Sequence, residues 1–429
     1  MKWVVSMRLV KALVLSLPAV GMTLGGVSAV VGLNAVASAP VYAAEKPADK
    51  QVSAKVGKPL QEALQLVRAK DFKGAKAKLD EAREASKKSA FDEYKINEIA
   101  SYVAFNMGDP NTAVKALDSM LDSPEASAAD RQRILDQLSK FEYQSKDYTN
   151  AIKYGSRYLK DVGPNIDIAL LVAQAYYLQK DYPQAINATQ SLIRMANQAG
   201  QTEKKEWLDL LRSAQQLAGK DDDANATLSV LLTKYPSPEY WRDTFIIEQN
   251  KGRGSDRKNM ELLRLKMVTG VLKDSDYMEM AQLGFALGFP GDAKMILEKG
   301  FANKVLGTGN DKDRENRLLA KAQTDSAADQ KSLAAFEKEA NAASNGEADI
   351  KLGFAYETYG DYQKAIDVMK RGLKKGNLKA EDEAHFLLGV TYFNAKKTSD
   401  AIAQFKAVPA DSKLASLARL WIIYANSKG

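Results

Sequence analysis

The chain has 429 residues, of which 45% are hydrophobic and 27% are charged, a balance typical of folded proteins. Its 61 Lys and Arg residues exceed its 54 Asp and Glu residues by seven, and outside the first 43 residues the balance is 58 against 54. So mild a basic charge does not favour a nucleic-acid-binding protein. The sequence has no cysteine and a single histidine, which excludes thiolate nucleophiles, the usual Ser-His-Asp triads, and zinc sites built from Cys and His.

The first 43 residues predict a secretory signal peptide. They begin with three basic residues, continue as a long apolar segment rich in Gly, Ala and Ser, and end on the small-x-small sequence Val41-Tyr42-Ala43. A retained membrane anchor is the alternative, because the apolar segment is long enough to span a bilayer. We expect cleavage near Ala43, followed by a flexible mature N-terminus at 44–58.

A short motif of Asp, an aromatic residue, two further residues and Ala recurs through the rest of the chain. It is DYTNA at 147–151, DYPQA at 181–185 and DYQKA at 361–365. The closing Ala, or its equivalent, recurs at intervals of 34–39 residues or about twice that, at Ala75, Ala113, Ala151, Ala185, Ala224, Ala293, Ala365 and Ala401. This spacing indicates an array of supersecondary units.

Each unit predicts two amphipathic helices joined by a turn. In the unit at 350–373, apolar residues at helical spacing lead to Gly360, a typical helix end, and Asp361 is placed to cap the next helix. Ala365 then falls where two antiparallel helices cross closely, so that only a small side chain fits. The motif therefore marks the turn and the crossing point of one helical hairpin.

These residues resemble the tetratricopeptide repeat family, whose pattern has Leu-Gly and Tyr in the first helix and Ala in the second. The matching positions are Leu352, Gly353, Tyr356 and Ala365 in one unit, and Leu388, Gly389, Tyr392 and Ala401 in the next. The resemblance is strong at 131–200 and 345–410. It implies an all-α fold, a right-handed superhelical α-solenoid of helical hairpins.

The resemblance and the helical patterns together predict the organisation of the chain. We expect an N-terminal repeat array at 59–236, degenerate helical hairpins at 237–344, and a pair of repeats with a capping helix at 345–429. The ranges 237–275 and 305–345 lack the repeat signature, and each fills one missing period. The last stretch, 413–428, predicts an unpaired helix that caps the array.

The sequence offers little for catalysis, and we expect a protein that is not an enzyme and needs no cofactor or metal. His385 falls at a core position of a repeat, which favours a role in packing. The polar segment 307–316 lacks the Gly and Glu of a calcium-binding loop. Basic residues Lys251, Arg253, Arg257 and Lys258 either contact anionic envelope polymers or lipid head groups, or form a solvated loop.

What remains is a binding surface. In the family, first helices line a concave face, and the resemblance places on it the residue that follows the Tyr position. In this chain these residues are Phe105, Tyr143, Tyr177 and Phe393, with Glu357 as the exception, and their neighbours are Tyr102, Asn106, Lys140 and Gln174. The aromatic residues either anchor a partner protein or pack between adjacent repeats, and the sequence leaves both interpretations open.

We therefore expect a non-catalytic adaptor or scaffold that binds a protein partner in the cell envelope, with no nucleic acid and no small-molecule substrate. The chain resembles signal-bearing tetratricopeptide proteins of Gram-negative bacteria, which implies a periplasmic location. Some of these are associated with the TonB energy-transduction system. The alternative is a factor that binds or assembles an envelope polymer, such as peptidoglycan or exopolysaccharide. Membrane contact is expected only if the N-terminal segment is retained.

Overall fold

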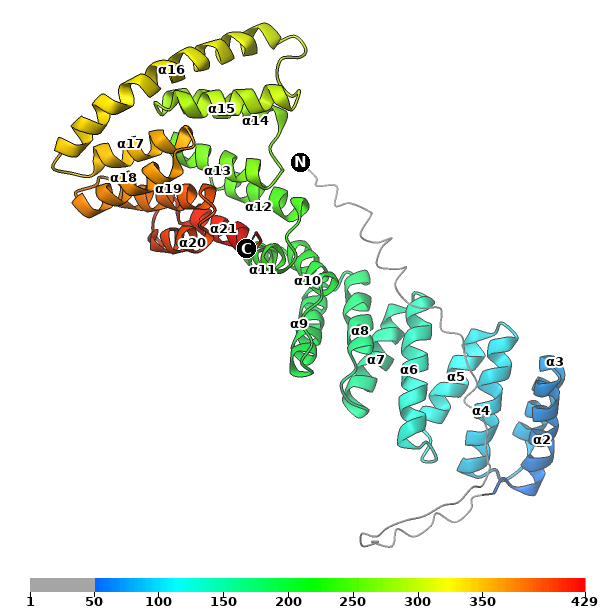
Figure 1. Cartoon of the computed structure of the whole chain (residues 1–429). Coiled ribbons are helices and arrows are strands. Elements are labelled where there is room, and N and C mark those ends of the chain that lie inside the picture. The colour runs from blue at the N-terminus through cyan, green and yellow to red at the C-terminus, as the bar shows by residue number, and fades with distance from the viewer. Residues whose placement is uncertain (1–50, 253, 429) are drawn as a thin grey trace, which may run out of the picture. The chain divides into compact units, whose positions relative to one another are not determined.

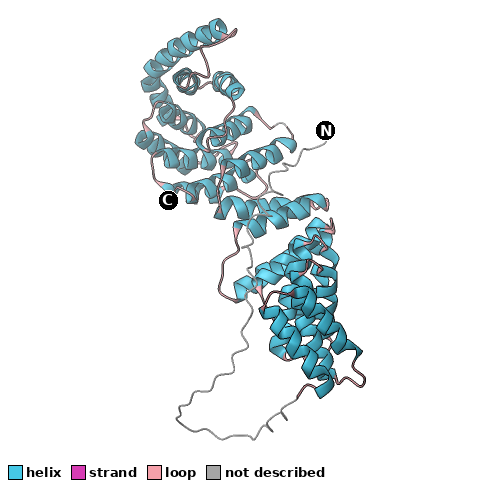
Figure 2. Ribbon diagram, turned by 90° about the vertical axis from the view of Figure 1, so that its right-hand side faces the viewer, coloured by secondary structure: helices cyan, strands magenta, loops and turns pink. Residues whose placement is uncertain are grey.

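The computed structural model describes residues 51–252 and 254–428, and every regular element in these ranges is an α-helix (Figures 1 and 2). This confirms the predicted all-α solenoid. The predicted signal peptide at 1–43, and 44–50 of the predicted flexible segment, lie outside the described residues. Among the described helices, none combines the length and apolar character needed to span a membrane.

Five helical hairpins make up the N-terminal array, and in each we call the first helix A and the second helix B. The hairpins are α2 (Ala54–Arg68) with α3 (Phe72–Glu84), α4 (Ala90–Asn106) with α5 (Pro110–Leu121), α6 (Ala128–Gln144) with α7 (Tyr148–Asp161), α8 (Ile166–Leu178) with α9 (Tyr182–Gln198), and α10 (Lys205–Leu217) with α11 (Asp221–Lys234). The first helix begins five residues before the predicted start at 59. The Ser53 backbone N–H donates to Asp92 Oδ1 of α4 at 2.8 Å, which ties down the residue before this helix.

The later helices include three further hairpins. These are α14 (Asp274–Ala286) with α15 (Pro290–Ala302), α17 (Glu347–Thr358) with α18 (Tyr362–Lys375), and α19 (Glu381–Asn394) with α20 (Thr398–Ala407). The unpaired helices are α12 (Pro238–Asn250), α13 (Asp256–Val268), α16 (Lys312–Ala342) and α21 (Ala415–Asn426).

Two of the unpaired helices differ from the predicted degenerate hairpins. The range 305–345 contains one helix of 31 residues, α16. Residues 312–342 form a single helix because they include neither Gly nor Pro to turn the chain and are rich in good helix formers. In the range 237–275, α13 has only a slight contact with α12 and packs instead against later helices.

The eight hairpins share one turn of three residues. The middle residue has a positive φ, and it is Lys70, Gly108, Lys146, Lys180, Gly219, Gly288, Gly360 or Lys396. In five of the hairpins the next residue is an Asp whose carboxylate accepts a hydrogen bond from the first turn of the B helix, as Asp147 Oδ1 does from the Asn150 N–H at 3.0 Å. The turn thus closes the A helix with a left-handed residue and opens the B helix with a capping side chain.

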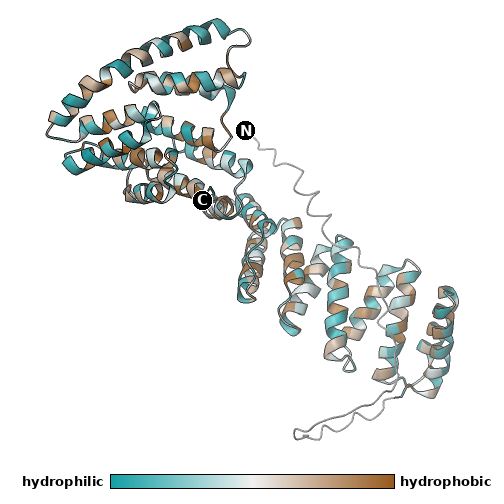
Figure 3. Ribbon diagram, viewed as in Figure 1, coloured by the Kyte–Doolittle hydropathy of each residue, from teal (hydrophilic) through white to brown (hydrophobic). Residues whose placement is uncertain are grey.

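The recurring Ala residues lie where the A and B helices cross. All eight are buried, at 0–4% exposure. The facing A-helix position in two repeats is Gly353 or Gly389, where a Cβ would lie 2.5 Å from the Met369 side chain or 2.7 Å from the Phe405 ring. The repeat residues Tyr356 and Tyr392 are also buried. Hydrophobic and hydrophilic residues alternate along the helices of the hairpins, as Figure 3 shows.

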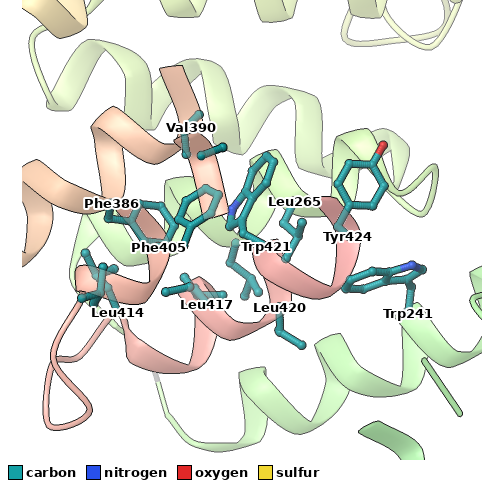
Figure 4. Packing of buried hydrophobic residues seen from close by; sticks show 14 of the residues in the cluster. Trp241, Leu265, Phe386, Val390, Phe405, Leu414, Leu417, Leu420, Trp421 and Tyr424 are labelled. Atoms are coloured by element: carbon teal, nitrogen blue, oxygen red, sulfur yellow. The ribbon is translucent and has the colours of Figure 1, made fainter. Parts of the chain in front are cut away.

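The C-terminal helix α21 joins distant parts of the chain. It covers α20, as predicted for a capping helix, and it also contacts α11 and α13. In Figure 4, Trp421 and Tyr424 of α21 lie among Phe405 of α20, Trp241 of α12 and Leu265 of α13. The Tyr424 O–H donates to the carbonyl of Val268 at 2.7 Å. The C-terminal helix α21 is therefore packed against helices more than 100 residues earlier.

We expect Lys146→Gly to raise the free energy of unfolding by about 0.5–1 kcal/mol, because glycine adopts the φ of +64° at this turn without a Cβ clash. Chemical denaturation followed by circular dichroism measures the change. The matched control is Lys115→Gly in the exposed middle of α5, which should lose about 0.7 kcal/mol of stability. A loss of stability in both variants would contradict the prediction.

Candidate protein-binding surface

The A helices of the N-terminal array share one surface. Neighbouring A helices contact each other directly, α2 with α4, α6 with α8, and α8 with α10. We call the side of α2, α4, α6, α8 and α10 that faces away from the B helices the A-helix face. All predicted site residues except Phe393 belong to these helices.

Phe105 lies on this face between two hairpins. Its ring packs edge-on against Phe141 of α6, with the ring centroids 6.0 Å apart, yet the residue remains 40% exposed. Tyr102 packs edge-on against Phe72 of its neighbouring B helix, and its carbonyl accepts a hydrogen bond from Asn106 Nδ2 at 2.8 Å. Phe105 therefore contributes to packing and still presents part of its ring to solvent.

Tyr143 and Tyr177 repeat one arrangement in successive hairpins. The Tyr143 O–H donates to Gln174 Oε1 of the next A helix at 3.2 Å, and the Tyr177 hydroxyl lies 2.8 Å from the Ser213 hydroxyl. Each ring also packs edge-on, at 5.7 Å, against the Tyr that begins the B helix of its own hairpin. Burial raises the pKa of Tyr143 to about 12. These two rings join adjacent A helices, which matches the packing interpretation.

Four of the seven exposed large hydrophobic residues in the described part of the chain lie on A helices of this array or directly after one. Leu64, Phe105, Met107 and Leu217 are 39–43% exposed. Charged residues of these A helices form ion pairs, either within one helix, as Lys140 does with Asp136 at 2.7 Å, or with another helix, as Arg212 of α10 does with Asp243 of α12 at 2.7 Å. The A-helix face is thus apolar and aromatic, with its charges locally balanced.

Phe393 does not lie on an open face, contrary to the prediction. Its ring is 5.4 Å from that of Trp421 and 5.5 Å from that of Tyr424, so α21 covers it. The capping helix has to bury its own apolar side, and the last A helix supplies the surface. The sequence predicts the cap but not which face it covers.

A helix of the chain itself occupies the corresponding face of the later hairpins, which the sequence analysis missed. Phe354 and Glu357 of α17 stand at the positions where the N-terminal A helices present their candidate residues, and both contact α13. All seven residues at 260–266 of α13 are buried. The guanidinium carbons of Arg257 and Arg264 lie 4.8 Å and 4.9 Å from the centre of the Phe354 ring.

Six charged residues surround this contact, and we call them the α13 charge cluster. They are Arg257, Glu261 and Arg264 of α13, Asp292 of α15, Glu357 of α17 and Glu383 of α19. Arg264 hydrogen-bonds to Asp292, and its Nη1 lies 3.7 Å from Glu357 Oε2. Arg257 Nε donates to Glu383 Oε1 at 2.9 Å. Four carboxylates therefore face two guanidinium groups.

Burial changes the acidity of this cluster. It raises the pKa of Glu357 to about 7, although the Arg264 charge opposes the shift. It also raises the pKa of Glu261, which is fully buried and has no hydrogen bond to either carboxylate oxygen. Glu357 accepts a hydrogen bond from Asn394 Nδ2 at 2.6 Å. The one residue that interrupts the predicted aromatic row, Glu357, was the available signal of this contact.

The remaining candidates have structural partners. His385 Nδ1 lies 2.8 Å from Gln404 Oε1 of the next helix. Arg257 belongs to the buried cluster, so it is not available to an envelope polymer, and Arg253 lies outside the described residues. Within 51–252 and 254–428, no group of three or more His, Asp or Glu residues is placed to hold a metal ion.

Comparison with known proteins adds little to these observations. No family model and no curated protein matches the sequence. The chain is similar to a solved tetratricopeptide repeat protein from Parabacteroides merdae, with 13% identity over 78% of this chain and 99% of that one, at a TM-score of 0.27. It is also similar to Naa15/Naa10 bound to HypK-THB, with 14% identity over 87% and 67% of the chains at a TM-score of 0.28. A Rap protein complexed with competence and sporulation factor gives 13% identity over 87% and 98%, at 0.23.

We expect Arg264→Leu to lower the free energy of unfolding by about 3–5 kcal/mol at pH 8, because it leaves buried carboxylates without their counter-charge. The loss should be smaller at pH 5, where Glu357, with a pKa raised to about 7, holds a proton. Denaturation followed by tryptophan fluorescence at both pH values measures it, since Trp241 and Trp421 lie in the same half of the chain.

Arg242→Leu on the exposed side of α12 is the control for this change and should shift stability by less than about 0.5 kcal/mol. An equal loss at pH 5 and pH 8 in the Arg264 variant would show that the carboxylates do not govern the effect.

Proposed function

We propose that this chain is a non-catalytic scaffold that binds a protein partner through the A-helix face of its N-terminal array. The observation that carries the proposal is that Leu64, Phe105, Met107 and Leu217, which lie on A helices of the array or directly after one, remain 39–43% exposed. Partly exposed aromatic and aliphatic side chains held by a packed scaffold are suited to anchor a partner. The rings of Tyr143 and Tyr177 stiffen this surface by linking successive A helices.

The later hairpins support the proposal by example. There, positions equivalent to those of the A-helix face contact α13, a buried helix, with aromatic and charged side chains. The same fold in the N-terminal array presents apolar side chains that no described helix covers. A helical segment of another protein is a partner of the right shape for such a face.

We further propose that the scaffold acts after export, in the periplasm, as part of an envelope complex. The support is the N-terminal sequence, whose apolar segment and Val41-Tyr42-Ala43 fit a signal peptide. A role in a TonB-type system rests on family resemblance alone. The mass of the mature N-terminus, measured on protein isolated from cells, tests cleavage near Ala43 against retention as an anchor.

The binding surface is tested with a photo-crosslinking amino acid placed at Phe105 or Leu217 in intact cells. We expect both positions to crosslink to the same protein. Phe105→Ala and Leu217→Ala should each weaken binding of that protein by about tenfold, as for an anchor residue at an interface. Isothermal titration calorimetry with the purified partner measures the affinity.

Val230 of the B helix α11 is a matched control, because it is equally apolar and 37% exposed. Crosslinker at this position should not capture the partner, and Val230→Ala should bind normally. Retention of the chain on purified peptidoglycan, with no protein crosslinked at Phe105 or Leu217, would instead favour the polymer-binding alternative.

A further inference from the structure

We propose that α13 is a proton-sensitive latch, docked in a groove formed by α15, α17 and α19 and released as the pH rises, because four carboxylates crowd two arginines at the docking contact. The inference goes beyond the proposed function and does not depend on a partner. It concerns a second A-helix face, which the chain itself occupies.

The position of α13 is that of a bound helix rather than of half a hairpin. Its contact with α12 is slight and its most extensive helix contact is with α14, while its arginines reach α15, α17 and α19 through ion pairs. Met260 and Leu263 pack into the core of α14 and α15, and Leu262 and Leu265 pack into the core that includes α21. Gly270, directly after α13, has a φ of +75°, and α14 begins only at Asp274. A short non-helical connection with a glycine therefore separates α13 from α14, and its residues Val271 and Leu272 pack against the two cores.

The docked state concentrates negative charge away from water. With all six residues of the α13 charge cluster ionised, two negative charges remain unbalanced. The carboxylates of Glu261, Asp292 and Glu357 are 0–5% exposed, whereas that of Glu383 is 35% exposed. The groups that face them are Arg257 and Arg264 of α13, Asp292 of α15, Glu357 of α17, Tyr362 of α18, and Glu383 and Asn394 of α19. Neither oxygen of Glu261 has a hydrogen-bond donor. Such a cluster is stabilised by taking up a proton.

The direction of the pH dependence follows from linkage. In the docked state burial raises the pKa of Glu357 to about 7, and when α13 leaves the groove the carboxyl returns to water and to its ordinary value near 4.5. Between pH 4.5 and pH 7, the docked state therefore binds a proton on Glu357 that the released state does not bind. The docking equilibrium is strongest in acid, weakens as the pH rises from 4.5 to 7, and then levels off, which amounts to about tenfold between pH 6 and pH 8.

Release uncovers the face that now holds α13. That face carries Phe354, which packs against both arginines, together with the carboxylates of Asp292, Glu357 and Glu383. The latch thus controls access to a groove built for an arginine-bearing helix.

Hydrogen exchange of the full chain, followed by mass spectrometry at pH 6 and pH 8 and corrected for intrinsic rates, tests the latch. We expect the amides at 260–266 to be about tenfold better protected at pH 6 than at pH 8. The peptide at 169–175 of α8 is the internal reference and should show no such difference. Equal protection of α13 at both pH values, or a parallel change in α8, would overturn the proposal.

Variants assign the effect to the cluster. E261Q/E357Q removes both buried acids with raised pKa, and its α13 protection should be the same at pH 6 and pH 8. E357Q alone, which keeps an oxygen for Asn394, should reduce the ratio if the double variant does not fold. E298Q removes an exposed acid of α15 and should keep the tenfold ratio. A full ratio in E357Q and in the double variant would refute a role for these carboxylates.

Discussion

The close crossing of the two helices in each hairpin is the constraint on which the rest of the structure depends. At Ala365 and Ala401 the B helix lies so near its A helix that the facing residues are Gly353 and Gly389, where even a Cβ would meet neighbouring atoms at 2.5–2.7 Å. Packing this tight sets the distance between helices and the angle at which each hairpin meets the next. The regular spacing of side chains such as Tyr143 and Tyr177 along the A helices is a consequence of that repetition.

The sequence predicts the hairpins, whose residues lie close together in the chain, and does not predict the contacts between distant helices. The turn at 145–147 and the crossing residue Ala151 lie within a few residues of each other in the sequence, so the hairpins could be predicted from single segments. The contact of α13 with α17 joins residues about 90 positions apart, and no local pattern encodes it. The covering of Phe393 by Trp421 is similar, because an apolar residue on an A helix has the same pattern whether it meets a partner or a capping helix.

Tyr143 and Glu357 occupy the same repeat position but make different contacts. At this position the N-terminal array has aromatic residues, which hydrogen-bond to the next A helix and keep the surface uncharged. In α17 the same position is a buried carboxylate that faces Arg264. With a charge in place of a ring, the same repeat position contacts a basic helix instead of contributing to an open apolar face, on a hairpin with the same three-residue turn.

A buried cluster of this kind is an uncertain source of stability but a strong source of specificity. Removing charges from water opposes docking, and the attraction between Arg264 and its carboxylates offsets this only where the geometry is good. Arg264 is held by Asp292 and stacked near Phe354, whereas Glu261 lacks a hydrogen bond altogether. Since an apolar helix would fill the groove without this cost, the charges fix which helix docks and in which register, and the imbalance among them makes that docking respond to protons.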